Sequence, residues 1–509
     1  MNTEGILRSL IGEKAAFSLV KGINDDKVYV RHTLTEKGKI CTEVHGLASK
    51  ELRNWIFYIR EGSVALKEIS ARQKEAVAVS AFDKTIKEVQ VAKRVAYNDE
   101  EKSIYLCLHD ERHHVVKVSS EGWKVIKERK APVVFLRSGN TKALPVPVEG
   151  GDLKNLQHFV NVNDDDLSLI IGWLLTTFYS SIDCPILHME APKGSGKTTA
   201  TRFLKELVDP DTTGVIAPFR TYKDLCTAAS HVHLLALDNL SGFSKKESDE
   251  LCRAVTGAGH LDRKLFTDGK LHTSVLHNPF ITNGINFGEL QPDLRDRCYS
   301  IKLRPLDGES RKSQDELNRE FEAEKPKLLG AILDALVNAL GNGDYEPEID
   351  TRLLDAGKFI MRAAAHNNSH LPFSEEKFKE VLTESKKQEE ISYALDNPIA
   401  CAIYYMAQEA KDKSDTKGDI PVWEGTTSKL LLAVKSKAKE IGIGKNILKS
   451  PVSLGKKMRE VSELLKPYDI EISNEGHNYK GSKFTITYLT SREAVEGEVK
   501  EAKTQAVEN

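Results

Sequence analysis

The stretch CPILHMEAPKGSGKTTATRFLKEL, Cys184–Leu207, determines the fold class of this 509-residue chain. It consists of a continuous apolar run, a glycine-containing loop and an amphipathic segment, which predict a buried strand, a turn and a helix in that order. In such a loop the backbone N–H groups turn towards phosphate oxygens, and the N-terminus of the following helix adds a favourable dipole. The stretch therefore predicts an α/β fold of the P-loop type.

The loop Ala191–Thr198 follows the P-loop pattern GxxxxGK[ST], except that alanine takes the place of the first glycine. In this pattern Lys197 reaches the β- and γ-phosphates of ATP, and the hydroxyl of Thr198 binds Mg²⁺. A chance match is the alternative, which the strand before the loop and the helix after it disfavour. The predicted nucleotide-binding residues are Lys193, Gly194, Ser195, Gly196, Lys197, Thr198 and Thr199.

A second apolar run, HVHLLALD, predicts a buried strand that ends in Asp238, where a carboxylate can complete the Mg²⁺ shell. The next residue is Asn239, whose amide can position a water molecule but cannot accept its proton. Two interpretations stay open. Either hydrolysis is slow, or it is assisted by a nearby carboxylate from Glu247, Asp249 or Glu250.

A third run, NPFITN, predicts a strand between the first two that ends in Asn283. This amide can hydrogen-bond the γ-phosphate or the attacking water, although a strand-end asparagine is also a common turn former. The following QPDLRDR places Arg295 and Arg297 in a turn, from which an arginine can act on the nucleotide of a neighbouring subunit. A surface ion pair to Asp293 or Asp296 is the alternative. Three continuous apolar strands of this kind suit a parallel sheet with helices on both faces.

The segment Gly259–Leu276 predicts a hairpin, because two alternating runs flank an Asp-Gly turn signal. Such a hairpin can project into the central channel of a ring and contact DNA phosphates. An ordinary surface hairpin is the alternative. Its candidate DNA contacts are Arg263, Lys264, Lys270 and His272.

The segment Trp423–Tyr488 predicts three helices followed by two strands, which is typical of a winged helix. From Lys445 to Lys483 it carries eight Lys or Arg and five Asp or Glu, a local excess of positive charge. Winged helices also serve as protein-docking modules, so DNA binding is one of two interpretations. The candidate contacts are Ser453, Lys456, Lys457 and Arg459 on the second helix of the motif, and His477, Lys480 and Lys483 on the wing.

The composition excludes several classes of protein. With 73 basic and 75 acidic residues, the formal net charge of −2 excludes a binder driven by an overall basic charge. The N-terminus lacks the features of a signal peptide, and no run of about 18 apolar residues predicts a membrane span. Seven scattered cysteines without a CxxC pair argue against both a disulfide framework and a zinc site. We therefore expect a soluble, cytoplasmic protein.

The length predicts three to four domains at roughly 150 residues each. The first 130 residues contain strand-like runs and one helical stretch, Leu66–Ser80, and the Pro- and Gly-containing passage Leu144–Leu153 predicts a linker. The predicted organisation is a mixed α+β N-terminal domain (1–150), a P-loop ATPase core (151–306), a helical lid or connector (307–395), a winged-helix domain (396–490) and a flexible tail (491–509).

The order of motifs from about Gly122 to Leu303 resembles a bacterial family. The motifs are EGWKVI, PVVFLRSGNTKALPVPVEGG, GSGKTT, LLALDNLSGF, ITNGI and QPDLRDR. The family comprises ATP-binding, helicase-like proteins of phages, satellites and integrated mobile elements, related to the superfamily 3 and MCM-type AAA+ helicases. The C-terminal SPVSLGKKMREVSELLKPYDIEI is similar to the winged-helix end of the same proteins.

The resemblance implies a ring-forming ATPase, expected to be a hexamer, that translocates on DNA. It implies that Lys197 and Thr198 belong to Walker A, Asp238 to Walker B and Asn283 to sensor 1, with Arg297 as the arginine finger. Family members commonly carry Asp-Asn at the end of Walker B, so Asn239 matches the family, whereas Ala191 departs from it. The N-terminal domain has no acidic dyad of a primase, and its predicted partner is DNA, a primase or another replication protein.

Our first hypothesis is therefore an ATP-dependent DNA helicase or replication initiator of a mobile element. An ATP-gated DNA-binding switch or helicase loader with little hydrolysis is the second, and Asn239 favours it. An NTPase of an anti-phage defence system has the same motifs and is the third.

Overall fold

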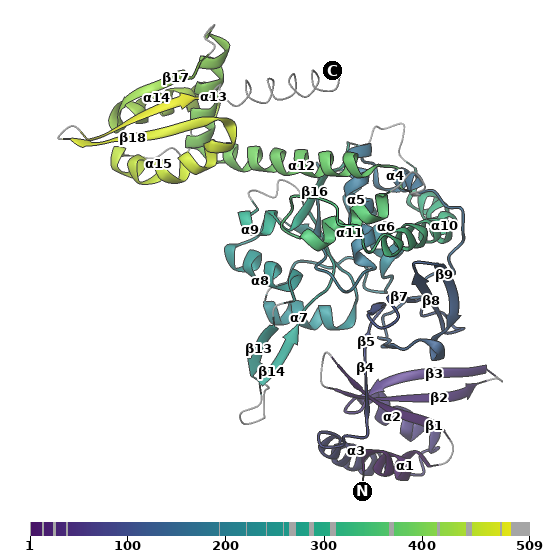
Figure 1. Cartoon of the computed structure of the whole chain (residues 1–509). Helices are drawn as coiled ribbons and strands as arrows, with labels where there is room; N and C mark the ends of the chain where they lie inside the picture. Colours follow the sequence, from purple (N-terminus) through teal and green to yellow (C-terminus); the bar gives the residue numbers. More distant parts are fainter. Residues whose placement is uncertain are drawn as a thin grey trace. The chain divides into compact units, whose positions relative to one another are not determined.

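The structure is a computed structural model of the chain (Figure 1). It describes residues 2–12, 15–23, 27–36, 39–192, 194–219, 221–240, 242–257, 259–263, 271–284, 290–305, 312–365, 371–414, 418–443, 450–478 and 481–489. The chain divides into two compact units, Met1–Ser385 and Lys386–Asn509. The predicted tail, 491–509, lies outside the described residues.

The first part of unit 1 is a four-stranded sheet packed against three helices. The strand order is β3-β2-β1-β4, with β1 parallel to β4 and antiparallel to β2. The helix α3 is the one that the sequence predicted, whereas α1 and α2 were not predicted. Both are short, and their apolar residues form a buried face only where they pack on the sheet. The elements are α1 (Thr3–Ile11), β1 (Ala16–Gly22), β2 (Val28–Glu36), β3 (Lys39–Gly46), α2 (Lys50–Ile59), α3 (Leu66–Ser80) and β4 (Lys87–Val89).

A second sheet follows as an antiparallel meander in the order β6-β7-β8-β9. Its strands account for strand-like runs that the sequence contains within the first 130 residues. Beside it, β5 pairs in parallel with β10. The strands are β5 (Val91–Ala92), β6 (Val95–Asn98), β7 (Ser103–Cys107), β8 (His114–Ser119), β9 (Gly122–Lys127) and β10 (Val134–Phe135).

The third sheet contains the three predicted buried strands and is parallel throughout, in the order β12-β15-β11-β16. The strand that ends near Asn283 lies between the other two, as the sequence predicted. Because all strands run in one direction, their carboxyl ends lie at one edge of the sheet, where ligands of open α/β sheets bind. The strands are β11 (Ile186–Glu190), β12 (Leu235–Leu240), β15 (Phe280–Gly284) and β16 (Cys298–Lys302).

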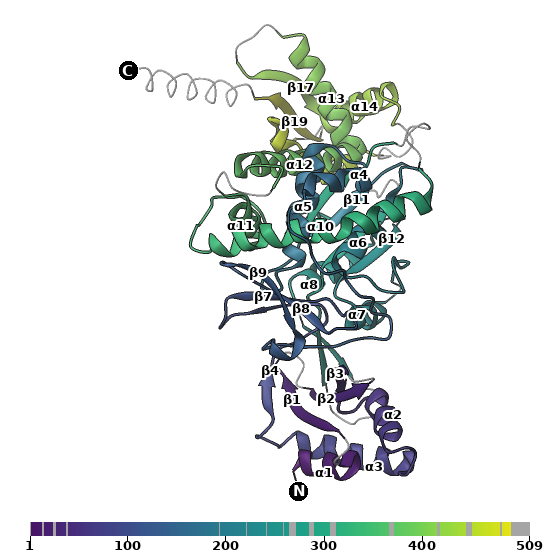
Figure 2. The ribbon, with the colours of Figure 1, turned by 90° about the vertical axis from the view of Figure 1, so that its right-hand side faces the viewer.

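Helices cover both faces of this sheet, which confirms the prediction (Figure 2). Leu187, Met189 and Ile281 point to one face and join the core formed with α5, α6 and α10. Ile186 and Phe280 point to the other and join a core with α7, α8 and α9. The helices are α4 (Gln157–Val160), α5 (Asp164–Thr177), α6 (Lys197–Val208), α7 (Tyr222–His231), α8 (Lys245–Val255), α9 (Pro292–Arg295), α10 (Gln314–Gly341), α11 (Leu354–Ala364) and α12 (Glu375–Asp396).

The passage Leu144–Leu153, which the sequence analysis assigned to a linker, is packed along α10. The Val148 N–H donates to the Pro326 carbonyl at 2.9 Å. A Cβ added to Gly330 would lie 1.9 Å from the Val148 carbonyl oxygen, so the two backbones are in close contact. Leu144 and Leu153 are both buried. The passage is therefore held against α10 by a close backbone approach and is not a free connection.

The predicted hairpin is present as an antiparallel pair of β13 (Gly259–Arg263) and β14 (Leu271–Val275). In Figure 1 it projects beyond α7 and α8. Its turn, residues 264–270, lies outside the described residues.

Unit 2 has the order helix, strand, helix, helix, strand, strand, with a three-stranded antiparallel sheet ordered β17-β19-β18. The sequence predicted helices from the start of Trp423–Tyr488 and missed the strand β17 that precedes the first of them, in which Trp423 pairs with Ile486. This short run of apolar and turn residues forms a strand only by pairing with β19, far along the chain. The elements are α13 (Pro398–Asp412), β17 (Ile420–Thr426), α14 (Thr427–Glu440), α15 (Pro451–Leu465), β18 (Ile470–Asn478) and β19 (Gly481–Tyr488).

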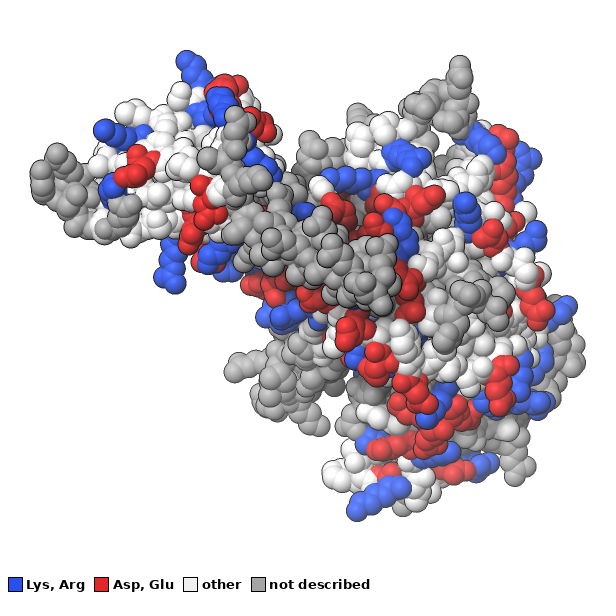
Figure 3. Space-filling model, turned by 45° about the horizontal axis from the view of Figure 1, so that its top comes forward, with Lys and Arg blue, Asp and Glu red and all other residues white. Residues whose placement is uncertain are grey.

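Basic and acidic side chains are interspersed on the face drawn in Figure 3, in agreement with the near-zero net charge. Every helix within the described residues is too short or too polar to cross a bilayer.

Candidate nucleotide site and nucleic-acid surfaces

The loop between β11 and α6 owes its shape to two glycines. Gly194 and Gly196 have φ values of 86° and 80°, a region that residues with a side chain rarely adopt. Ser195 is buried, and its hydroxyl donates to the Pro192 carbonyl at 2.8 Å. Ala191, which replaces the first glycine of the pattern, is buried and is not among the residues with positive φ. The conformation at the loop entrance therefore does not require glycine.

Lys197 is the first residue of α6, and its ammonium group turns back to the loop. The Nζ donates to the carbonyls of Ala191 at 2.5 Å and of Pro192 at 3.2 Å. Partial burial lowers the pKa of Lys197, while the carboxylate of Asp238 acts in the opposite direction. The ammonium group of Lys197 therefore lies among backbone carbonyl oxygens of the loop.

Thr198 and Asp238 meet at the carboxyl edge of the parallel sheet. The Thr198 hydroxyl donates to Oδ2 of Asp238 at 3.1 Å and lies 3.2 Å from Oδ1. Neighbouring ligands of an octahedral Mg²⁺ lie about 3.0 Å apart, because each is about 2.1 Å from the ion. The two oxygens therefore fit adjacent positions on one Mg²⁺ ion.

Asn283 connects the end of β12 with α6. Its Oδ1 accepts from the Asn239 N–H at 3.0 Å, and its Nδ2 donates to the Thr201 hydroxyl at 2.6 Å. The Thr201 hydroxyl in turn donates to the Lys197 carbonyl at 3.0 Å. Asn283 is fully buried, and its two hydrogen bonds hold the end of β15 to the end of β12 and to α6. Sequence reasoning missed Thr201, although its position one helical turn after Lys197 was an available signal.

Asn239 lies at an irregularity in the strand. The register of β12 and β15 shifts between Leu237 and Leu240, and Asn239 has a φ of 58°. Its side chain is exposed. A left-handed conformation at a functional strand end is uncommon for a residue other than glycine and is most accessible to Asn and Asp.

The three carboxylates considered as alternative bases differ in their partners and in their exposure. The Glu247 carboxylate caps α8, accepting from the Ser244 N–H at 2.8 Å and from the Ser244 hydroxyl at 2.7 Å. Glu250 is buried and lies 3.8 Å from the Lys246 ammonium. Asp249 is exposed.

Thr199, another of the predicted nucleotide-binding residues, is engaged elsewhere. Its hydroxyl donates to the side-chain amide oxygen of Gln314 at 3.2 Å.

The two candidate arginines lie on α9 and just after it. Arg297 is 8% exposed, donates to the Asp293 carbonyl at 2.5 Å and forms an ion pair with the Asp293 carboxylate at 2.6 Å. The hydrogen bond from Arg297 lowers the pKa of Asp293. The ion pair considered as an alternative is therefore present in the single chain. Arg295 is partly exposed.

On α15, the predicted second helix of the motif, the basic residues lie opposite the core. Lys456, Lys457 and Arg459 are exposed, whereas Leu454 and Met458 are buried. The three cations have no ion pair within the part of the chain that the structure describes.

Of the remaining candidate DNA contacts, two already have partners within the chain, and the side chains of the others are not described. The Ser453 N–H is capped by Ser450 at 3.2 Å, and Lys483 forms an ion pair with Glu424 at 2.5 Å. The backbones of Arg263, His272 and His477 lie in strands, and their side chains are not described. Four further candidates lie outside the described residues: Lys193, Lys264, Lys270 and Lys480.

Residues 152–368 match a protein-family model described as the actinomycete integrative conjugative element replication protein. This segment is less than half of the chain and contains Lys197, Asp238, Asn283 and Arg297. Over it, the chain is similar to a replication protein of a mobile element. No curated protein matches the chain.

Two solved structures are similar at low identity. The apo C-terminal region of NrS-1 has a TM-score of 0.42 and 12% identity, covering 96% of this chain and 100% of that chain. JCV helicase has a TM-score of 0.24 and 16% identity, covering 47% of this chain and 65% of that chain.

Proposed function

We propose that this chain is an ATP-dependent DNA motor of AAA+ type that acts in the replication of a mobile element. The observation that carries the proposal is the convergence of Thr198 and Asp238 beside the loop that bears Lys197. A hydroxyl, a carboxylate and an ammonium at the carboxyl edge of a parallel sheet are the groups that Mg²⁺ and a nucleoside triphosphate require. The match of residues 152–368 to a replication-protein family supports the same role.

In this proposal Lys197 exchanges the carbonyls of Ala191 and Pro192 for the β- and γ-phosphate oxygens of ATP. The N–H groups of the loop at Gly194 and Gly196 donate to the same phosphates. Thr198 and Asp238 would hold Mg²⁺, which would supply positive charge against the charge that develops on the phosphates. The exposed Asn239 amide orients the attacking water, and Asn283 keeps Asn239 in position.

The proposal assigns DNA to two surfaces. Unit 2 has the element order of a winged helix, and the exposed Lys456, Lys457 and Arg459 on α15 would contact duplex phosphates. The β13–β14 hairpin would contact a single strand in the channel of a homo-oligomeric ring, for which a hexamer is expected. In such a ring Arg297, or its neighbour Arg295, would reach the nucleotide of the adjacent subunit. For Arg297 this requires release of its ion pair with Asp293.

The test is steady-state ATP hydrolysis with and without single-stranded DNA, for the wild-type chain and for Lys197→Ala. We expect DNA-stimulated turnover that the substitution abolishes, and nucleotide-dependent assembly in sedimentation. A wild-type chain that stays monomeric with ATP and DNA would contradict the motor.

A second function, an ATP-gated DNA-binding switch or loader, is favoured by one observation. Asn239 carries an amide where a carboxylate would accept the proton of water, and the nearby Glu247 is engaged as a helix cap. A switch would bind ATP and DNA tightly with near-zero multiple turnover. The hydrolysis experiment therefore separates the two functions.

A further inference from the structure

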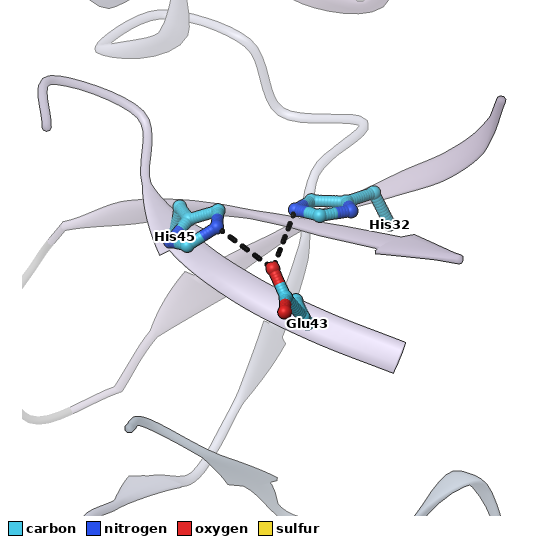
Figure 4. Close-up of side chains that lie close together, drawn as sticks. All are labelled: His32, Glu43 and His45. Atoms are coloured by element: carbon cyan, nitrogen blue, oxygen red, sulfur yellow. Dashed lines mark ion pairs between the residues drawn. The ribbon is translucent and has the colours of Figure 1, made fainter. Parts of the chain in front are cut away.

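Three side chains with metal-binding atoms converge on the β2–β3 ribbon, far from the P-loop in sequence (Figure 4). His32 on β2 is paired directly with Glu43 on β3. His45 follows Glu43 by two residues, so both side chains lie on the same face of β3. Opposite and diagonal neighbours on one face of a ribbon are within contact distance. The register of two strands thus brings together two imidazoles and a carboxylate.

The distances between the side chains fit a small cation. Oε2 of Glu43 lies 3.3 Å from Nε2 of His45 and 4.0 Å from Nε2 of His32, and the three ligand atoms all lie within 4.8 Å of one another. Ligands of a tetrahedral Zn²⁺ lie about 3.4 Å apart, because each is about 2.0–2.2 Å from the ion. The Glu43–His45 pair already has this spacing, and no pair must shorten by more than about 1.4 Å to reach it. Octahedral neighbours lie about 3 Å apart and require a larger contraction.

The surroundings of His32 favour metal binding by its imidazole. Its side chain is fully buried, and neither ring nitrogen has a hydrogen-bond partner within the described part of the chain. The indole of Trp55, from α2, stacks on the imidazole with 3.6 Å between ring centroids and so fixes the ring plane. A buried imidazole with a fixed ring plane and no hydrogen-bond partner is suited to a metal and costly without one.

The other two side chains keep the cluster open to solvent. The Glu43 side chain is 45% exposed and that of His45 is 22% exposed. An ion can therefore enter from the surface, and water can occupy a fourth position, as in zinc sites with three protein ligands.

We propose that His32, Glu43 and His45 bind one Zn²⁺ ion with water as the fourth ligand. The donor set of two imidazoles and a carboxylate prefers a first-row divalent metal to Mg²⁺. The site uses no cysteine, which is why the cysteine pattern of the sequence did not indicate it. The proposal is independent of the nucleotide site, because the P-loop is not part of the cluster.

The test is Zn²⁺ titration calorimetry on the nucleotide-free full chain, with metal content measured after dialysis. We expect one Zn²⁺ per chain, and at least about tenfold weaker binding in each of Glu43→Gln and His45→Gln. His277→Gln is the matched control, because His277 lies 3.0 Å from the carboxylate of Asp183 in a two-residue pair. It should bind Zn²⁺ as the wild type does. Equal binding by the wild type and Glu43→Gln, or none by the wild type, would overturn the proposal.

Two further measurements complete the test. Co²⁺ in the wild-type site should give the intense visible absorption of tetrahedral coordination, which both ligand variants lose. Zn²⁺ should also raise the midpoint of thermal unfolding of the wild type and not of Glu43→Gln, whose metal-free midpoint serves as the folding control. A chain that binds Fe²⁺ with six-coordinate spectra and rejects Zn²⁺ would overturn the assignment. Because none of these readouts uses ATP, they stand apart from any failure of the motor.

Discussion

The Thr198 hydroxyl lies 3.1 Å from Oδ2 of Asp238, although the two residues are 40 positions apart in the chain. One comes from the first turn of α6 and the other from the end of β12. The parallel sheet brings them together because its strands all end at the same edge. Lys197 precedes Thr198 at the start of α6, and the Asp238 carboxylate is close enough to raise its pKa against the effect of burial. A cation, a hydroxyl and a carboxylate near this edge of the sheet are the physical basis of the proposed Mg²⁺–nucleotide site.

The first prediction concerns this pair of oxygens. Thr198→Val and Asp238→Asn each remove one proposed Mg²⁺ ligand at nearly constant size, so ATP hydrolysis should fall by about a hundredfold or more. Binding of a fluorescent nucleotide in the presence of a chelator should change little, because Lys197 and the loop remain. Thr383→Val is the control, because its hydroxyl donates only to the Lys379 carbonyl within α12, and it should keep its activity. Full activity of Thr198→Val and Asp238→Asn, or an equal loss in Thr383→Val, would contradict the assignment.

The second prediction concerns Asn283, whose side chain holds Asn239 and Thr201 by hydrogen bonds of 3.0 and 2.6 Å. Asn283→Ala leaves the Asn239 N–H without its acceptor and removes the donor to the Thr201 hydroxyl, which keeps its bond to the Lys197 carbonyl. The free energy of unfolding should therefore fall by about 1–3 kcal/mol, and the ATPase rate should fall with it. Asn278→Ala is a matched control. Its buried amide donates to three backbone carbonyls of the segment before β12, away from the loop.

Urea unfolding and ATPase assays distinguish the two variants. Asn278→Ala should lose stability and keep its turnover per folded molecule, whereas Asn283→Ala should lose both. Similar turnover in the two variants would show that Asn283 has a purely structural role.

Local patterns in the sequence were sufficient to predict the elements whose formation depends on short-range preferences. The strand, loop and helix around Lys197 follow from an apolar run, glycines and an amphipathic repeat. The hairpin, predicted from the turn signal Asp268-Gly269, and the helix α3 also follow from local patterns. The strand β17 was missed, because Trp423 lies in a short segment that becomes a strand only through its distant partner β19.

Features that depend on register or on distant contacts were not predictable. The positive φ of Asn239 coincides with a register shift between β12 and β15. The cluster of His32, Glu43 and His45 requires the pairing of two strands whose register no local signal specifies. Likewise, the buried Arg94 finds its partner Asp209 115 residues later.

The third prediction concerns the close backbone approach at Gly330. A Cβ at this position would lie 1.9 Å from the Val148 carbonyl oxygen, and the backbone atoms cannot yield as a side chain would. Gly330→Ala should therefore lower the free energy of unfolding by about 1–3 kcal/mol or more, even though alanine favours a helix. Gly139→Ala is the control, because an added Cβ there meets nothing within 4 Å. Chemical denaturation of both variants checks the prediction. Equal stability would mean that the Leu144–Leu153 passage is not held against α10.

The fourth prediction concerns the ion pair between Arg94 and Asp209, which lie 2.9 Å apart with side chains 0% and 7% exposed. Arg94→Met leaves a buried carboxylate without its main partner, so it should lower the free energy of unfolding by about 3–5 kcal/mol. Arg72→Met removes an exposed ion pair with Glu75 and should change it by less than about 1 kcal/mol. Urea denaturation of both variants at neutral pH measures the difference. A small loss in Arg94→Met would contradict a structural role of the pair.

The same pair predicts a dependence on pH. Burial alone would raise the pKa of Asp209, but Arg94 and Lys205 outweigh it and hold the pKa below its usual range. Because the pKa is lower in the folded than in the unfolded chain, the stabilisation is complete above about pH 4, the pKa of an unfolded aspartate. It should be lost as the pH falls below that value. The unfolding free energy of Asp209→Asn, measured across this range, should depend less on pH than that of the wild type.

The last prediction concerns the exposed basic face of α15. If Lys456, Lys457 and Arg459 contact phosphates, replacing all three by alanine should weaken duplex binding for every sequence tested. It should also reduce the slope of log affinity against log salt by about 0.9 for each phosphate that a removed cation had neutralised. Lys466→Ala is the matched control, because its ammonium already pairs with Glu463 at 2.8 Å. Fluorescence anisotropy over a salt series measures both quantities. If the triple variant and the control have the same slope as the wild type, unit 2 does not bind DNA through α15, and the face is better explained as a protein-docking surface.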